Sequence, residues 1–117
     1  MKRDFELFRE ILLLLEKLES FDDPVIPNIP DRTKHEVVYH IKLLSEAGLI
    51  EAQNWSTDDG PEWVATSLTS SGHDFLDAAR NNTIWKKAMS IVVAQGAALT
   101  IETLKAALSK VVRDMLQ

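Results

Sequence analysis

The sequence predicts a mostly helical fold with one small β-hairpin. Apolar residues recur at spacings of three and four along several segments, which is typical of amphipathic helices. A cluster of turn-forming residues, 56–61, lies between two short runs that favour β-strands. The chain has 117 residues, of which 45% are hydrophobic, so it suits a single domain with a buried core.

The first expected element is a helix over about residues 4–19. Its recurring apolar residues are Leu7, Phe8, Ile11, Leu12, Leu15 and Leu18. At these spacings they share one face of the helix. Leu14 broadens this stripe, so we expect the helix to be covered on more than one side and to be central to the fold.

Region 21–30 contains three of the four prolines of the chain. Each proline removes an amide donor and disfavours helix at the residue before it. The region is therefore expected to be extended, with a short edge strand through Val25 and Ile26.

A second helix is predicted from a capping box formed by Thr33 and Glu36, in which each side chain can bond the backbone amide of the other. Apolar residues then follow at Val37, Ile41, Leu44 and Ala47. Gly48 supplies the stop, because a left-handed residue is favoured just after a helix.

A hairpin is expected next, with strands over about 49–55 and 63–68 packed beside the second helix. Ser56 to Pro61 form the loop between them, which is longer than the tightest turns.

Three helices are predicted after the hairpin. Thr69 can cap the first, which runs to about Arg80. Thr83 can cap the second, which ends near Gly96, and Thr100 can cap the last. The last helix carries an apolar seam of heptad character: Ile101, Leu104, Leu108, Val111 and Met115.

This order of elements is typical of a winged helix, in which a recognition helix passes directly into a hairpin, the wing. We expect a compressed winged helix-turn-helix core over 1–82. A helical extension over 83–117 is expected to pack on this core or on a second chain, in one domain overall. The helix that usually supports a recognition helix is missing or reduced, because prolines occupy its place.

The whole chain also resembles an uncharacterised family of short bacterial and prophage proteins. The matching phrases are Met1-Lys2-Arg3-Asp4, Tyr39-His40-Ile41-Lys42-Leu43-Leu44, Gly72-His73-Asp74-Phe75-Leu76-Asp77-Ala78-Ala79-Arg80 and Trp85-Lys86-Lys87. The resemblance implies the winged-helix-like fold and a phage context, and it implies no activity.

The acidic net charge of the chain disfavours nucleic acid as the partner. The net charge is −5, from 13 basic and 18 acidic residues, and no Lys or Arg lies between Lys42 and Arg80. The expected wing therefore carries Asp58 and Asp59 where a DNA-binding wing needs cations. The chain has no cysteine and its longest apolar run has five residues. We expect a cytoplasmic protein with no disulfide, no thiolate metal site and no membrane segment.

The candidate recognition surface lies on and just before the second helix. Its residues are Arg32, Lys34, His35, Tyr39 and Lys42. Lys42 can contact phosphate, while His35 and Tyr39 can contact bases or a protein partner. The alternative is an ordinary solvated helix face, which needs no function.

No cofactor or catalytic centre is expected. His35 and His40 are five residues apart, a poor spacing for one metal ion on a helix, and no nucleotide or nucleophile motif is present. We expect His40 to be a partly buried structural residue. Trp55, Trp63 and Trp85 are expected to be packing anchors, with a protein interface on the hairpin as the alternative.

Two functions follow, neither of them enzymatic. The first is a DNA-binding regulator, and the second is a protein-interaction module that keeps the fold without binding DNA. The C-terminal seam offers a homodimer interface in either case.

Overall fold

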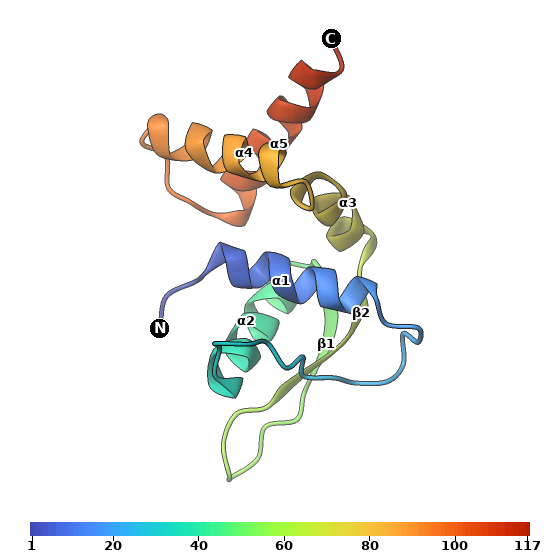
Figure 1. Ribbon diagram of the computed structural model, residues 1–117. Coiled ribbons are helices and arrows are strands. Elements are labelled where there is room, and N and C mark those ends of the chain that lie inside the picture. Colours follow the sequence, from blue (N-terminus) through green and yellow to red (C-terminus); the bar gives the residue numbers. More distant parts are fainter. The chain divides into compact units, whose positions relative to one another are not determined.

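The prediction of a mostly helical chain with one small hairpin is confirmed. The computed structural model describes residues 1–117 as two compact units, 1–73 and 74–117 (Figure 1). Together the two units contain five helices and one two-stranded antiparallel sheet. The expected division into a core over 1–82 and an extension over 83–117 stays a prediction. None of the helices combines the length and the apolar character needed to span a bilayer.

Helix α1 (Phe5–Glu16) begins at Asp4, whose carboxylate accepts hydrogen bonds from the amides of Glu6 and Leu7. It buries six apolar side chains: Phe5, Leu7, Phe8, Ile11, Leu12 and Leu15. The helix ends three residues before the predicted limit. Leu18 consequently lies beyond it and is 39% exposed, and Leu14 lies at the edge of the buried stripe and is 36% exposed. The prediction that these two leucines extend the buried face was wrong.

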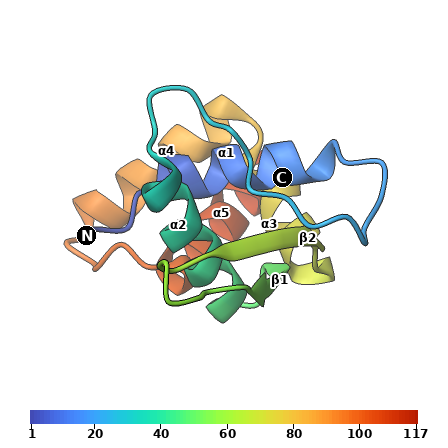
Figure 2. The same cartoon turned by 90° about the horizontal axis from the view of Figure 1, so that it is seen from below.

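The proline-rich segment between α1 and α2 (Lys34–Glu46) contains no helix. Two backbone hydrogen bonds of 2.8 Å join Val25 to Ala65, and each residue donates one of them. The expected edge strand is therefore present in its shortest form, as one bridge at Val25. Figures 1 and 2 show the segment passing beside strand β2 (Trp63–Leu68).

Helix α2 has the predicted termini. Thr33 and Glu36 form the capping box, with the Glu36 amide 3.1 Å from the Thr33 hydroxyl. Gly48 has a φ of 77°, and the Leu49 amide next to it bonds the Leu44 carbonyl. The buried residues of α2 are Val37, Val38, His40, Ile41 and Leu44. Ala47, expected to continue this stripe, is instead the exposed C-cap.

Strand β1 (Ile50–Asn54) pairs antiparallel with β2, and both strands pack on α2, as predicted. A bulge after Glu51 leaves Thr66 without a partner in the register. The loop is long, but it closes in a tight turn, because Thr57 and Gly60 exchange two backbone hydrogen bonds of 3.0 Å around Asp58 and Asp59. β1 is an edge strand, whereas β2 also bonds Val25 on its other side.

The hairpin is joined to helix α3 (Ser70–Ala79) by Thr69 and Gly72. The Thr69 hydroxyl donates to the Gly48 carbonyl at 2.6 Å and accepts from the Gly72 amide at 3.0 Å. A Cβ on Gly72 would lie only 1.9 Å from the Leu49 carbonyl oxygen. Only glycine therefore allows this close approach of the two backbones.

In the second unit, α4 (Asn82–Ala94) packs against α5 (Ile101–Met115). The N-cap of α4 is Asn81 and not Thr83, because the Asn81 side chain accepts from the Ile84 amide and starts the helix earlier. Thr100 caps α5, as predicted.

The predicted seam on α5 is covered within one chain. Leu104, Leu108 and Val111 are buried, and Ile101 is half-buried. Met115, the last of the five, is 57% exposed. The seam was expected to be covered either by the same chain or by a second copy. Its buried members are covered within the chain in this conformation, and a homodimer stays a prediction.

Candidate functional site

The structure places the five predicted recognition residues at the start and on the outer face of α2. Lys34 and His35 are exposed, while Arg32, Tyr39 and Lys42 are partly exposed. The spacing of His35, Tyr39 and Lys42 puts them on one face of the helix. Lys34 brings the predicted surface into contact with the hairpin, because its side chain is paired with Glu62.

Arg32 connects two segments of the first unit. Its guanidinium lies 2.6 Å from the Asp4 carboxylate and 3.6 Å from that of Glu36. Burial opposes ionisation of Asp4, but the Arg32 guanidinium and the Leu7 and Glu6 amides outweigh it and hold the pKa of Asp4 below its ordinary value. The hydrogen bond to Asp4 likewise raises the pKa of Arg32. Arg32 thus links the start of α1 to the first turn of α2.

The two lysines also have carboxylate partners. Lys34 Nζ lies 2.9 Å from a Glu62 oxygen at the start of β2, so this pair joins α2 to the hairpin. Lys42 Nζ lies 2.9 Å from a Glu46 oxygen one turn further along α2. Every cation of the predicted surface is therefore paired with an acidic residue of the same chain.

His40 is buried, and both of its ring nitrogens are bonded. Nε2 accepts from the Asp4 amide at 2.9 Å, and Nδ1 lies 2.8 Å from the Glu36 carbonyl. Since a backbone amide can only donate, Nε2 is unprotonated and Nδ1 carries the hydrogen. The ring also packs edge-on against Phe8 and Tyr39. The prediction that His40 is buried is confirmed, and its burial is more complete than the sequence indicated. Its structural role stays a prediction.

The hairpin presents an aromatic residue to solvent. Trp55 is 47% exposed, and its indole N–H donates to the Gln53 side chain at 2.9 Å. Asp58 and Asp59 are exposed at the tip of the loop. Trp85, in contrast, is buried and packs edge-on against Phe75. The packing prediction therefore holds for Trp85 and is wrong for Trp55.

The two units differ in net charge. Residues 1–73 carry 7 basic and 14 acidic side chains, a net charge of −7. Residues 74–117 carry 6 basic and 4 acidic side chains, a net charge of +2. The predicted surface and the hairpin both belong to the acidic unit. No group of three or more His, Cys, Asp or Glu side chains that could hold a metal ion is found.

These features describe a small, mostly helical protein whose exposed hairpin adjoins a face of paired charges. The chain belongs to a family of hypothetical proteins, DUF2513, whose sequence profile matches residues 2–98. A protein of Haemophilus influenzae, described as an uncharacterized protein, is 33% identical in an alignment of 117 positions that covers 99% of each chain. No solved structure matches the chain significantly. The expected resemblance to an uncharacterised family is thereby confirmed.

Proposed function

We propose that this chain is a compressed winged-helix module whose hairpin binds another protein. The order of α1, the Val25 bridge, α2, β1 and β2 supports the winged-helix assignment. In this scheme α2 is the recognition helix, the hairpin is the wing, and a single turn replaces the supporting helix. That turn closes with a hydrogen bond from the Arg32 amide to the Ile29 carbonyl. The proposal keeps the cytoplasmic location and the phage context expected from the sequence.

One observation carries the preference for protein over DNA: Arg32, Lys34 and Lys42 are all paired with carboxylates. Contact with a phosphate would require each cation to leave its partner, and the carboxylate left behind would then repel the DNA backbone. The hairpin adds no cation of its own, because residues 49–68 contain only acidic charges. The paired cations and the acidic hairpin therefore weaken the attraction to DNA phosphates, which provides much of the affinity in protein–DNA complexes.

The hairpin surface indicates the chemistry of the partner. Trp55 offers a large apolar side chain, and aromatic residues of this kind are enriched among the residues that dominate protein interfaces. Asp58 and Asp59 add negative charge at the same end of the hairpin. We therefore infer a partner that presents an apolar recess with Lys or Arg at its rim, since such a surface complements both features.

A DNA-binding regulator is the second candidate, and the exposure of two ion pairs favours it. The Lys34 side chain is 67% exposed and that of Lys42 is 41% exposed. Solvent-exposed pairs contribute only about 0.2–1 kcal/mol, so phosphates could compete for these two lysines. The Arg32 pair with Asp4 is more enclosed and would resist such an exchange.

Site-specific photo-crosslinking in cells that naturally express the chain tests the proposal. A crosslinking amino acid at position 55 is expected to capture a protein, whereas the same amino acid at exposed position 109 on α5 is not. Asp58→Lys/Asp59→Lys is expected to abolish the crosslink, because it reverses the charge that the partner recognises. A crosslink that survives this reversal, or none at position 55, would contradict the proposed interface.

A further inference from the structure

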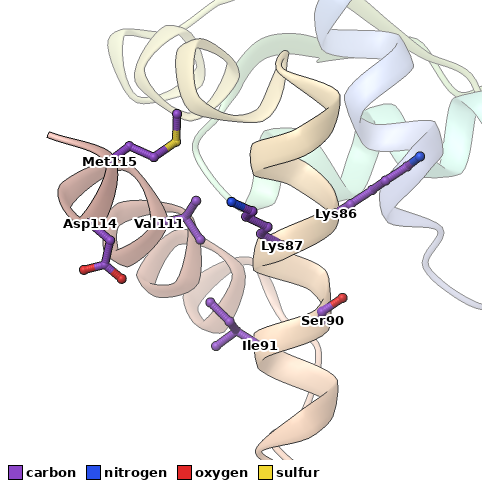
Figure 3. A pocket seen from close by; sticks show the side chains of 7 residues that line it. All are labelled: Lys86, Lys87, Ser90, Ile91, Val111, Asp114 and Met115. Atoms are coloured by element: carbon purple, nitrogen blue, oxygen red, sulfur yellow. The ribbon is translucent and has the colours of Figure 1, made fainter.

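A groove of about 470 Å³ lies between α4 and α5 in the second unit (Figure 3). Ile91 comes from α4, and Val111 and Met115 come from α5. In Figure 3 the side chains of Lys87, Ile91 and Val111 extend into the space between the two helices. The groove is open to solvent on one side, and its volume is large enough to accommodate a large side chain.

The charges at the groove are not balanced. Lys86 and Lys87 line it and form no ion pair. Asp114, the one carboxylate in the lining, is already paired with Lys110 at 3.0 Å. A complementary occupant therefore combines an apolar side chain with at least one free carboxylate.

The loop after α1 has this composition. Phe21 is 79% exposed and is followed by Asp22 and Asp23, both of them exposed. Ser20 and Asp22 are hydrogen-bonded to each other, which bends the chain around Phe21. In Figures 1 and 2 this light-blue loop projects beyond the C-terminal end of α1. We refer to residues 18–23 as the acidic loop.

We propose that the acidic loop of one copy docks into the α4–α5 groove of a second copy. Phe21 packs on Ile91, Val111 and Met115, while Asp22 and Asp23 lie near Lys86 and Lys87. The net charges of −7 on residues 1–73 and +2 on residues 74–117 favour contact between unlike units of two copies.

Such a contact differs from a dimer through the seam of α5. It joins two different surfaces, so it is heterologous, and repetition of it forms a ring or an open chain. It also leaves Leu104 and Leu108 in their buried positions. A contact made by one short loop is weak. Added salt weakens it further, because salt screens the exposed charges.

Sedimentation of the full chain between about 10 µM and 1 mM covers the affinities expected of such a contact. The wild type is expected to associate as its concentration rises. Phe21→Ser and, separately, Lys86→Glu/Lys87→Glu are each expected to weaken association at least about tenfold, because each removes one side of the contact. Leu116→Ser is the matched control: Leu116 is 81% exposed but does not line the groove, so association is unchanged.

Mixing the two defective variants gives the sharper result. The Phe21→Ser chain keeps its groove and the Lys86→Glu/Lys87→Glu chain keeps its loop, so the mixture is expected to form a 1:1 complex. Adding Asp22→Lys/Asp23→Lys to the Lys86→Glu/Lys87→Glu chain is expected to restore self-association. A wild type that is monomeric at 1 mM, variants that associate like the wild type, or a mixture that stays monomeric would each overturn the proposal.

Discussion

Asp4 and His40 connect three segments of the first unit: the start of α1, the turn at Arg32, and α2. Asp4 caps α1 with one carboxylate oxygen, binds Arg32 with the other, and donates its amide to His40. His40 in turn bonds the Glu36 carbonyl in the first turn of α2. The ring therefore satisfies a donor and an acceptor that come from two different segments.

Replacing His40 tests this role. His40→Gln cannot reproduce both ring hydrogen bonds in the same geometry, and it also removes the ring contacts with Phe8 and Tyr39. We expect the free energy of unfolding to fall by about 1–3 kcal/mol. Urea unfolding measures the change, with the exposed His73→Gln as the control. Equal stability of the two variants would argue against a structural role for His40, and stoichiometric zinc binding that His40→Gln abolishes would reassign it as a ligand.

Asp4 makes stability depend on pH. Its pKa is lower in the folded chain than in the unfolded chain, so its contribution is complete above the unfolded value of about 3.9. That contribution is lost as the pH falls through the folded value. We therefore expect wild type to be more stable than Asp4→Asn at pH 7, and the difference to shrink at about pH 3. Urea midpoints at the two pH values measure it, and a difference that did not change with pH would contradict the assignment.

At the scale of elements, the junction of the hairpin with α3 depends on Gly72. Any side chain there meets the Leu49 carbonyl, which belongs to the backbone and cannot rotate away. Gly72→Ala is therefore expected to lower the free energy of unfolding by about 1–3 kcal/mol, as overpacking does elsewhere. Ser71→Ala, at the exposed neighbouring position, controls for the change in composition. Thermal melts of both variants would show the difference, and wild-type stability of Gly72→Ala would refute the close contact.

The termini of most elements could be predicted because they depend on neighbouring residues. The capping box of Thr33 and Glu36, the stop at Gly48 and the cap at Thr100 all follow from local hydrogen bonds. The start of α4 could not be predicted in the same way. Asn81 and Thr83 are both good caps, and local preference does not choose between them.

The candidate site was predicted less completely than the fold. Its residues could be placed on one helix face by their spacing, but their ion pairs could not. Lys34 and Glu62 are 28 residues apart and Arg32 and Asp4 are also distant, so only tertiary structure brings them together. The exposure of Trp55 was missed because β1 ends at Asn54, one residue before the predicted limit. Trp55 therefore lies in the exposed loop and not in the strand.

At the scale of the whole molecule, the distribution of charge matters more than the net charge of −5. The predicted recognition face and the hairpin lie in a unit of net charge −7, and the unpaired lysines of the groove lie in a unit of net charge +2. The two protein contacts proposed above both depend on this distribution. The hairpin suits a cationic partner, and the groove suits an acidic segment.

The central claim is that α2 and the hairpin recognise a protein and not DNA. A measurement of binding to duplex DNA tests this claim most directly. Fluorescence anisotropy with a labelled duplex at physiological salt is expected to show no binding tighter than about 10⁻⁴ M, the weak end of non-specific affinity. Lys86→Ala/Lys87→Ala separates any binding through the groove from binding through α2. A Kd below about 10⁻⁶ M, weakened by salt and lost in Lys34→Ala/Lys42→Ala, would show that these lysines exchange carboxylate for phosphate and would contradict the account.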